Sequence, residues 1–185
     1  MASAPTHIVA AGAIAAKRIL VIGSGGSGKT TFARRLAERT TLPLIHLDAL
    51  YWRPGWDPTP ADEWRARVEA LANEPAWIMD GNYGGTLDIR LAASDTIVFL
   101  DVPRLVCLWR VVRRQLQHAG QNRAELPAGC PERLRWEFVK WIWTYPAVRR
   151  GSILRRLDDL KPHKRVYVLR SSREMNRFLD GLAEA

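Results

Sequence analysis

The fold is decided by an eight-residue stretch, Gly23-Ser24-Gly25-Gly26-Ser27-Gly28-Lys29-Thr30. It matches the pattern G-x-x-x-x-G-K-[ST] in full, and it lies between an apolar run at 19–22 and an amphipathic run at 30–39. Glycines let the backbone turn so that successive N–H groups face phosphate oxygens, and the helix that follows adds its positive end. Lys29 can reach the terminal phosphates, and the Thr30 hydroxyl can bind Mg²⁺. The stretch therefore predicts a nucleotide-binding loop between a strand and a helix.

Outward from this loop, short apolar runs alternate with longer amphipathic runs. The apolar runs predict four more strands, at residues 44–47, 77–79, 96–100 and 166–169. The amphipathic runs predict helices at 61–72, 105–117 and 172–182, and further helix within 131–160 that Pro146 and Gly151 interrupt. Strands that alternate with helices pack as a parallel sheet covered on both faces. We therefore predict an α/β, three-layer P-loop NTPase fold with a five-stranded parallel sheet.

Composition limits the partners. The chain has 185 residues and a net charge of +9, with a hydrophobic share of 47%. This length predicts one domain, and the apolar content excludes global disorder. A sequence pI of about 10.2 leaves two classes of partner open, phosphorylated small molecules and nucleic acid.

The cysteine content and the first residues indicate in which cellular compartment the protein is expected. Cys107 and Cys130 are too few to staple a fold of this size, so we expect a reducing cytoplasm. No apolar run approaches the ~18 residues of a transmembrane helix, and we expect no membrane partner. Residues 1–16 lack the charge order of a signal peptide and are predicted to be a flexible extension. The predicted domain is 17–185.

Two other classes of nucleotide-binding protein are excluded by what the chain lacks. Switch proteins that bind GTP usually carry an N-K-x-D string, which does not occur here. Motor ATPases need more length than the residues left after the loop. A small kinase remains.

Acidic residues follow the predicted strands, at the edge where open α/β sheets bind ligands. Asp48 can orient or deprotonate an acceptor hydroxyl, or simply cap a turn. Asp80 can work with Lys29 and Mg²⁺ in phosphoryl transfer. Asp101 can cap the next helix or bind metal, and we assign it no role. His46, within a predicted strand, is expected to be a core histidine.

The run Phe99-Leu100-Asp101-Val102-Pro103, followed by Arg110 and Arg113-Arg114, resembles the adenylate-kinase family's approach to its lid. The resemblance implies that Arg110 packs on adenine and that Arg114 contacts phosphates. It also implies that Asp80 acts through hydrated Mg²⁺. Arg90 is the nearest match to the family's substrate-phosphate arginine.

Three further strings resemble the P-loop kinases labelled topology modulation proteins (FlaR-like). They are Leu47-Asp48-Ala49-Leu50-Tyr51-Trp52, Pro54-Gly55-Trp56 and Trp77-Ile78-Met79-Asp80-Gly81-Asn82-Tyr83. This resemblance runs from Arg18 to the C-terminus. The family's label suggests an effect on DNA, whereas its motifs suggest a small-molecule kinase.

The acceptor and the lid are expected in two separate regions. The acceptor-binding region is predicted at about 48–76, where Trp52 or Trp56 can stack on a planar acceptor. The segment of about 115–150 is rich in arginine and is predicted to be a helical lid that closes over the phosphates. The lid arginines could equally form a solvated basic face that binds nucleic acid non-specifically.

Arg149 and Arg150 are the candidate lid arginines, and the resemblance does not choose between them. Trp136, Trp141 and Trp143, at helical spacing in the lid region, are expected to pack there.

The sequence thus predicts an ATP-dependent phosphotransferase that uses Mg²⁺ and acts on a small-molecule or nucleotide acceptor. The alternative is a nucleotide-regulated DNA-binding protein that modulates DNA topology. Expected catalytic residues are Lys29, Asp48, Asp80 and Arg114. Expected cofactor-binding residues are Gly23, Ser24, Gly25, Gly26, Ser27, Gly28, Lys29, Thr30, Thr31, Arg110 and Arg114. Expected substrate-binding residues are Asp48, Trp52 and Arg90, and expected metal ligands are Thr30 and Asp80.

Overall fold

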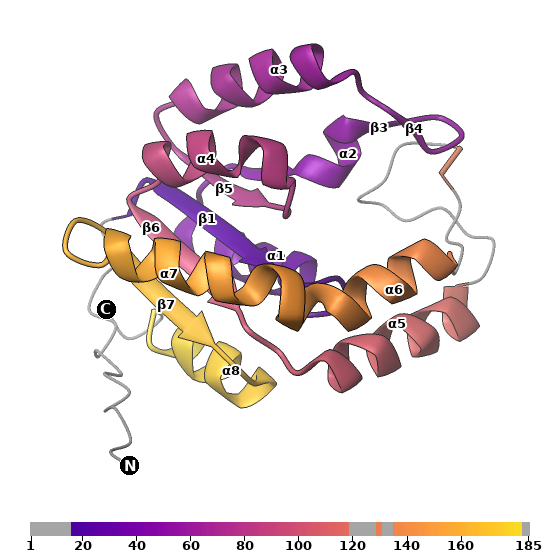
Figure 1. Cartoon of the computed structure of the whole chain (residues 1–185). Coiled ribbons are helices and arrows are strands. Elements are labelled where there is room, and N and C mark those ends of the chain that lie inside the picture. The colour runs from indigo at the N-terminus through magenta and orange to yellow at the C-terminus, as the bar shows by residue number, and fades with distance from the viewer. Residues whose placement is uncertain (1–15, 119–128, 131–134, 183–185) are drawn as a thin grey trace.

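A computed structural model describes residues 16–118, 129–130 and 135–182 of the chain. Five parallel strands form one sheet in the order β2-β5-β1-β6-β7, with helices on both faces (Figure 1). The strands are β1 (Arg18–Gly23), β2 (Leu44–His46), β5 (Trp77–Asp80), β6 (Thr96–Leu100) and β7 (Arg165–Leu169). The predicted α/β fold with a five-stranded parallel sheet is confirmed.

The helices that follow the strands supply the outer layers. They are α1 (Lys29–Thr40), α2 (Leu47–Tyr51), α3 (Ala61–Asn73), α4 (Leu87–Ala93), α5 (Arg104–His118), α6 (Trp136–Tyr145), α7 (Gly151–Leu160) and α8 (Ser172–Asp180). Two shorter helical segments are a 3₁₀ turn, η1 (Gly84–Thr86), and a π-helical segment, η2 (Pro146–Arg150). A small antiparallel hairpin joins β3 (Trp52–Arg53) to β4 (Asp57–Pro58).

The central strand β1 shows why the sheet is buried on both faces. Ile19 and Val21 pack into one core with α1, α5 and α8. Leu20 and Ile22 point the other way, into a second core with α4 and α7. A strand that is covered on both faces reads as a continuous apolar run, because alternate side chains meet different cores. The loop after β1 therefore starts from the central strand of the sheet, which is buried on both faces.

The helix that closes the chain starts as the sequence predicts. The Ser171 hydroxyl accepts a hydrogen bond from the Glu174 amide at 3.2 Å, and the Glu174 carboxylate accepts one from the Arg170 amide at 2.8 Å. The arrangement is a variant of the capping box in which the carboxylate bonds the amide just before the N-cap residue Ser171.

The structure differs from the sequence-based expectation after β2 and after β5. Leu47 is not the last strand residue but begins α2, so Asp48 lies in a helical first turn rather than at a strand end. Helix α4 and the β3–β4 hairpin are absent from the prediction, because both are too short for a periodic signal. Asp48 still lies at the carboxyl edge of the sheet, two residues beyond His46.

The expected interruptions at Pro146 and Gly151 coincide with changes of helix type: the α-helix gives way to a π-helical segment at Pro146 and resumes at Gly151. Helix continues from α6 through η2 into α7, and Pro146 opens the π-helical segment. A proline lacks the N–H of the regular i→i−4 ladder, and a widened turn accommodates its ring. Gly151 keeps right-handed helical dihedrals.

Parts of two predicted segments lie outside the described residues. Residues 1–15 of the expected extension are among them, whereas Ala16 is buried against the first core. Residues 119–128 and 131–134 of the expected lid are also among them. Within the described part of the chain, no helix is long and apolar enough to cross a membrane.

Candidate active site

The loop at residues 23–30 connects β1 to α1 as predicted, with the other elements packed tightly around it. Gly26 has a φ of +73°, and a Cβ at this position would collide with the Cys107 carbonyl at the start of α5. Gly25 lies under Phe138 and Ile142 of α6, which leave no room for a side chain. Glycine is therefore required here by backbone conformation in one case and by close approach in the other.

Thr30 and Asp80 meet at the junction of α1 and β5. The Thr30 hydroxyl donates a hydrogen bond to Asp80 Oδ2 at 2.8 Å. The other oxygen, Oδ1, is buried and has no hydrogen-bond partner among the described residues. An unpaired buried carboxylate oxygen is costly, so this atom is suited to a cation or its water.

These two residues fit Mg²⁺. Mg²⁺ bound with a nucleotide takes few protein ligands and keeps several waters, so one hydroxyl and one carboxylate are sufficient. In the described ranges, no group of three or more histidine, cysteine, aspartate or glutamate side chains is placed to hold a metal ion by itself.

His46 is a second neighbour of Asp80. It pairs with Asp80 in the sheet register, and its Nδ1 lies 3.3 Å from Asp80 Oδ2. The sequence-based expectation of a core histidine is therefore wrong, because the side chain is partly exposed and belongs to the candidate site.

Two basic side chains hold the loop in its present shape. The Lys29 amino group donates to the Ser24 carbonyl at 3.0 Å, so the lysine folds back over its own loop. The Arg110 guanidinium donates to the Ser27 carbonyl at 2.9 Å and to the Ser172 hydroxyl at 2.7 Å. Arg110 thus lies between the loop and the start of α8. Arg114, one turn further along α5, is partly buried and has interactions within the chain.

Asp48 is held by a residue that the sequence did not identify. The partly buried Tyr83 hydroxyl donates to Asp48 Oδ1 at 2.5 Å. Burial, and next the negative charge of Asp48, raise the pKa of Tyr83 well above its ordinary value, so the phenol keeps its proton. The Asp-Gly-Asn-Tyr string was noticed as a family resemblance, but only the fold brings its tyrosine to Asp48.

Aromatic rings surround this pair. The Tyr51 ring packs on Tyr83 at a centroid distance of 4.6 Å and on Trp64 at 5.1 Å. Trp52 continues the cluster at 4.9 Å from Tyr51, and Trp56 lies 5.3 Å from Trp52. The two tryptophans predicted for the acceptor region therefore form one edge of a continuous aromatic wall that leads to Asp48.

Arg90 does not face a ligand in this conformation, which corrects its expected role in substrate binding. The residue is fully buried. Its guanidinium donates to the carbonyls of Gly81 at 2.8 Å, Asn82 at 3.0 Å and Tyr83 at 2.7 Å. Burial lowers its pKa to about 10, which still leaves it protonated at neutral pH. Arg90 thus holds the backbone of the loop after β5 in place through these three carbonyl contacts.

Arg149 and Arg150 have different surroundings. The Arg150 guanidinium makes two hydrogen bonds to the Asp101 carboxylate, at 2.7 and 2.8 Å, and this pairing raises its pKa. Arg149 instead reaches over Gly84, next to the Tyr83 backbone. The structure therefore assigns Arg150 to an internal ion pair and leaves Arg149 beside the acceptor region.

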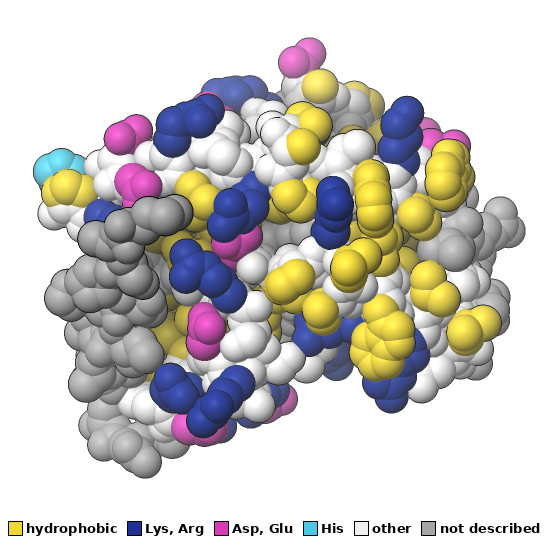
Figure 2. Space-filling model, turned by 60° about the horizontal axis from the view of Figure 1, so that its bottom comes forward, with side chains coloured by type: hydrophobic (Ala, Val, Ile, Leu, Met, Phe, Trp, Pro, Cys, Tyr) yellow, Lys and Arg dark blue, Asp and Glu magenta, His cyan; other side chains and the backbone are white. Residues whose placement is uncertain are grey.

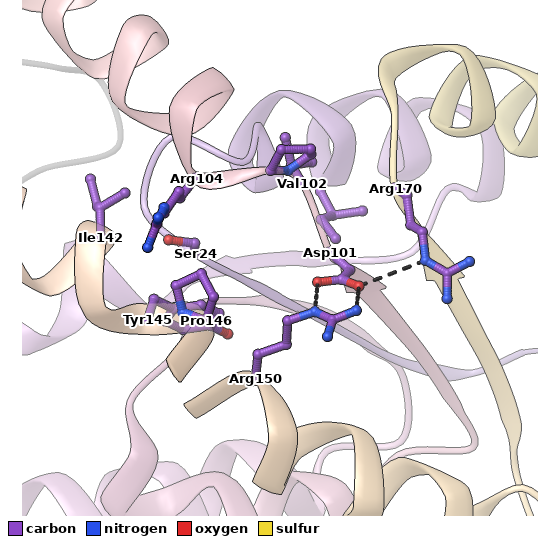
Figure 3. Close-up of a pocket in the computed structure, with 11 residues that line it drawn as sticks. Ser24, Asp101, Val102, Arg104, Ile142, Tyr145, Pro146, Arg150 and Arg170 are labelled. Carbon is purple, nitrogen blue, oxygen red and sulfur yellow. Dashed lines mark hydrogen bonds and ion pairs between the residues drawn. The ribbon is translucent and has the colours of Figure 1, made fainter. Parts of the chain in front are cut away.

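A pocket of about 270 Å³ lies on the other side of β1, at the carboxyl ends of β6 and β7 (Figure 3). The Arg150–Asp101 pair lies at its edge, and Arg170 approaches Asp101 at 3.7 Å. Ser24 of the loop and Tyr145 of α6 also line it, and burial raises the pKa of Tyr145. Asp101 thus ties the end of η2 and the residue after β7 to the end of β6.

The tryptophans expected to pack in the lid behave differently from one another. Trp141 packs against both cores and stacks on Phe138 at 5.9 Å. Trp136 and Trp143 are exposed, so the packing expectation is wrong for these two. Cys107 is fully buried, and burial raises the pKa of its thiol.

One described part of the lid segment touches the acceptor region. The Gly55 amide donates to the Gly129 carbonyl at 2.9 Å, and the buried Cys130 thiol lies 3.2 Å from the Arg53 carbonyl. The β3–β4 hairpin is therefore in contact with residues 129–130 of the lid segment.

No family model matches the chain, and no curated protein is similar to it. Solved structures are similar in fold. The shikimate kinase of Bacteroides thetaiotaomicron matches 92% of this chain over 98% of the kinase's own length, with a TM-score of 0.51 and 19% identity. A gluconokinase from Sinorhizobium meliloti 1021 matches over 91% and 92% with a TM-score of 0.50 and 19% identity. A sugar kinase from Janibacter sp. HTCC2649 gives a TM-score of 0.47 at 20% identity. At these identities the likeness establishes that the chain has the fold of the P-loop kinases.

Proposed function

We propose that this chain is an ATP-dependent phosphotransferase that acts on a small-molecule or nucleotide acceptor. The observation that carries the proposal is the contact between Thr30 and Asp80, with Asp80 Oδ1 buried and unpaired next to the phosphate loop. A hydroxyl and a carboxylate in this relation suit Mg²⁺ that arrives with ATP. The solved structures of similar fold are small-molecule kinases by their descriptions, which supports the proposal.

The loop backbone, Lys29 and Thr30 are proposed to take different parts in this reaction. The backbone amides of 24–30 bind the phosphates, and Lys29 swings from the Ser24 carbonyl to the terminal phosphates. Thr30, and Asp80 through water, would hold Mg²⁺, which supplies positive charge to the phosphate oxygens. Arg110 and Arg114 are proposed to contact the base and the phosphates.

Asp48 is proposed to accept the proton of the acceptor hydroxyl. The acceptor oxygen then forms a bond to the γ-phosphorus while the bond from phosphorus to the β–γ bridging oxygen breaks, and ADP leaves. Tyr83 holds Asp48 in place by its hydrogen bond. Most of the rate gain in such a site comes from positioning and electrostatics.

The acceptor is proposed to lie between the aromatic wall and Arg149. Trp52 offers an aromatic ring at one end of the wall, and Arg149 places a cation close to Gly84. The proposed acceptor region spans about 48–76 together with the loop after β5, and the proposed lid spans about 115–150.

The test is a screen of hydroxyl-bearing acceptors for acceptor-dependent ATP consumption. The Lys29→Ala variant is the blank in every well, because it keeps the fold but loses the phosphate contact. An acceptor that stimulates the wild type and not the variant supports the proposal. Asp48→Asn should then spare ATP affinity and lower turnover by a factor on the order of 10²–10⁴. Unchanged turnover in Lys29→Ala would contradict the proposal.

The alternative, a nucleotide-regulated protein that acts on DNA topology, has no support from the described residues. Arg110 and Arg150 are engaged within the chain rather than displayed as a phosphate-binding row. Membership of the topology modulation proteins also remains a prediction. A reducing cytoplasm is proposed on the grounds that Cys107 and Cys130 are buried, unpaired thiols.

A further inference from the structure

Helix α5 is apolar on the face that it turns away from the core. Four residues on this face are exposed, Leu105 by 66%, Trp109 by 59%, Val112 by 43% and Leu116 by 81%. A surface helix normally places polar residues there, and a helix that is apolar on opposite faces is normally buried. The outward face of α5 therefore has the apolar side chains that are normal for a helix face packed against another protein surface.

The spacing of these residues is that of a helix-pairing stripe. Leu105, Trp109, Val112 and Leu116 are separated by four, three and four residues, and at 100° per residue they fall within a sector of about 60°. Cys107 and Val111, which face the core, lie on the opposite side. A four-three-four spacing is that of the a and d positions in paired helices.

Helix α6 extends the surface. Trp136 and Trp143 are exposed on it, and the Arg104 guanidinium lies 4.1 Å from the centre of a Trp143 ring. Arg113 covers one side of Trp109 at 5.3 Å. The space-filling view shows apolar side chains gathered over this part of the molecule, with arginines among them (Figure 2).

We propose that the outward face of α5 is the interface of a homodimer, in which α5 of one copy packs antiparallel against α5 of a second copy. The proposal does not depend on the catalytic function. It requires only that the described face is covered in solution.

The stripe is complementary to itself when it is read in opposite directions. Antiparallel pairing about its midpoint places Leu105 against Leu116 of the second copy, and Trp109 against Val112. Each large ring then meets a small side chain, which is how packed layers interdigitate. Parallel pairing would place Trp109 against Trp109 and Val112 against Val112, which leaves one layer overfilled and the next underfilled.

Charge also favours the antiparallel arrangement. Arg113 flanks the stripe, and in the antiparallel register it faces Val106 of the second copy rather than another arginine. The two helix dipoles oppose each other, which places each positive end near a negative end. A second copy thus fits the stripe without bringing like charges together.

The exposed area is of the size that a dimer needs. The three exposed tryptophans alone present roughly 400 Å² when their exposed fractions are applied to ordinary ring areas. A stable interface buries about 800 Å² per partner, so α5 and α6 together can supply it.

The first test is the mass of the full chain by sedimentation velocity, from about 1 to about 100 µM protein. We expect a concentration-dependent shift from 20.9 kDa to twice that mass. Trp109→Glu and Leu116→Glu should each weaken the dimer at least tenfold, because each buries an unpaired charge. Ala66→Glu, at an exposed position of α3, is the matched control and should leave the dimer intact. Circular dichroism checks that all variants are folded.

The second test fixes the direction of pairing by disulfide formation. Leu105→Cys and Leu116→Cys chains are oxidised separately and as a mixture. Native Cys107 and Cys130 are buried, so the wild type should not cross-link. A crossed dimer that forms efficiently only in the mixture supports the antiparallel register.

Four results would contradict the proposal. One is a chain that stays monomeric over the whole concentration range, and another is a dimer that Trp109→Glu and Leu116→Glu do not weaken. Self-linking of Leu116→Cys alone would show a parallel pair and refute the register. A monomer that binds phosphatidylglycerol vesicles through Trp109 and Leu116 would show that the surface contacts lipid instead.

Discussion

The Tyr83 hydroxyl donates a 2.5 Å hydrogen bond to Asp48 Oδ1, and it joins the loop after β5 to the first turn of α2. The two residues are 35 positions apart in the chain. Hydrogen bonds to a charged partner contribute about 1.5–3 kcal/mol. The contact therefore fixes the carboxylate that is proposed to accept the acceptor proton.

Tyr83→Phe should lower turnover about tenfold and leave ATP affinity within about twofold, because only the orientation of Asp48 is lost. Steady-state kinetics and calorimetric ATP titration measure the two effects. Tyr51→Phe, in the same aromatic cluster, is the control and should retain turnover. Equal losses in both variants would show that the effect comes from packing.

Stability should fall at alkaline pH. The pKa of Tyr83 is raised by burial and by Asp48, so the folded state keeps a proton that the unfolded phenol releases near pH 10. This stabilising contribution is complete below about pH 10 and is lost as the pH rises further. Burial of Arg90 acts in the opposite sense in this range, so wild type and Tyr83→Phe must be compared. The melting temperature should fall less in the variant between about pH 9 and about pH 11. If the melting temperatures of wild type and Tyr83→Phe fell by the same amount over this pH range, Tyr83 would not be the source of the alkaline destabilisation.

Arg90→Met should reduce the free energy of unfolding by about 3 kcal/mol. The variant leaves the carbonyls of Gly81, Asn82 and Tyr83 without their buried donor. Arg67→Met is the control, because Arg67 is exposed and makes one hydrogen bond to the Leu50 carbonyl. Urea denaturation measures both. A stable Arg90→Met protein that only loses acceptor affinity would restore the ligand-binding role expected from the sequence.

Lys29→Ala should abolish productive ATP binding and change the unfolding free energy by no more than about 1 kcal/mol. The lysine donates to the Ser24 carbonyl at 3.0 Å and supports no core contact. Calorimetry with Mg-ATP measures the binding, and thermal melting measures the change in stability. Lys161→Ala is a surface control for both. Retained affinity in Lys29→Ala would mean that phosphates bind elsewhere.

DNA binding should be weak and should disappear steeply as salt rises. Each neutralised phosphate contributes about 0.9 to the slope of log affinity against log salt. Mg-ATP should compete with DNA, because the arginines of α5 and of the proposed lid that could bind DNA are proposed to turn toward the phosphates of ATP. Fluorescence anisotropy on duplex DNA, with and without Mg-ATP, measures this. Tight binding at physiological salt that nucleotide leaves unchanged would favour the DNA-binding alternative.

The sequence by itself determined the sheet and the phosphate loop. These features are local or periodic, since a buried parallel strand must be apolar along its length and a phosphate loop needs glycine at set positions. The strand positions at 19–22, 77–79, 96–100 and 166–169 follow from that periodicity. The glycine-rich pattern at residues 23–30, which predicts nucleotide binding, can therefore be identified from the sequence without knowledge of the fold.

The tertiary structure alone decided which side chains meet across the sheet. Arg90 is buried behind the loop after β5, Arg150 is paired with Asp101, and Arg149 lies over Gly84. An arginine has the same long, flexible side chain in all three places, and only the packing around it decides whether its charge reaches a ligand, a carboxylate or a set of carbonyls. Tyr83 meets Asp48 for the same reason, because β2 and β5 are neighbours in space and not in sequence.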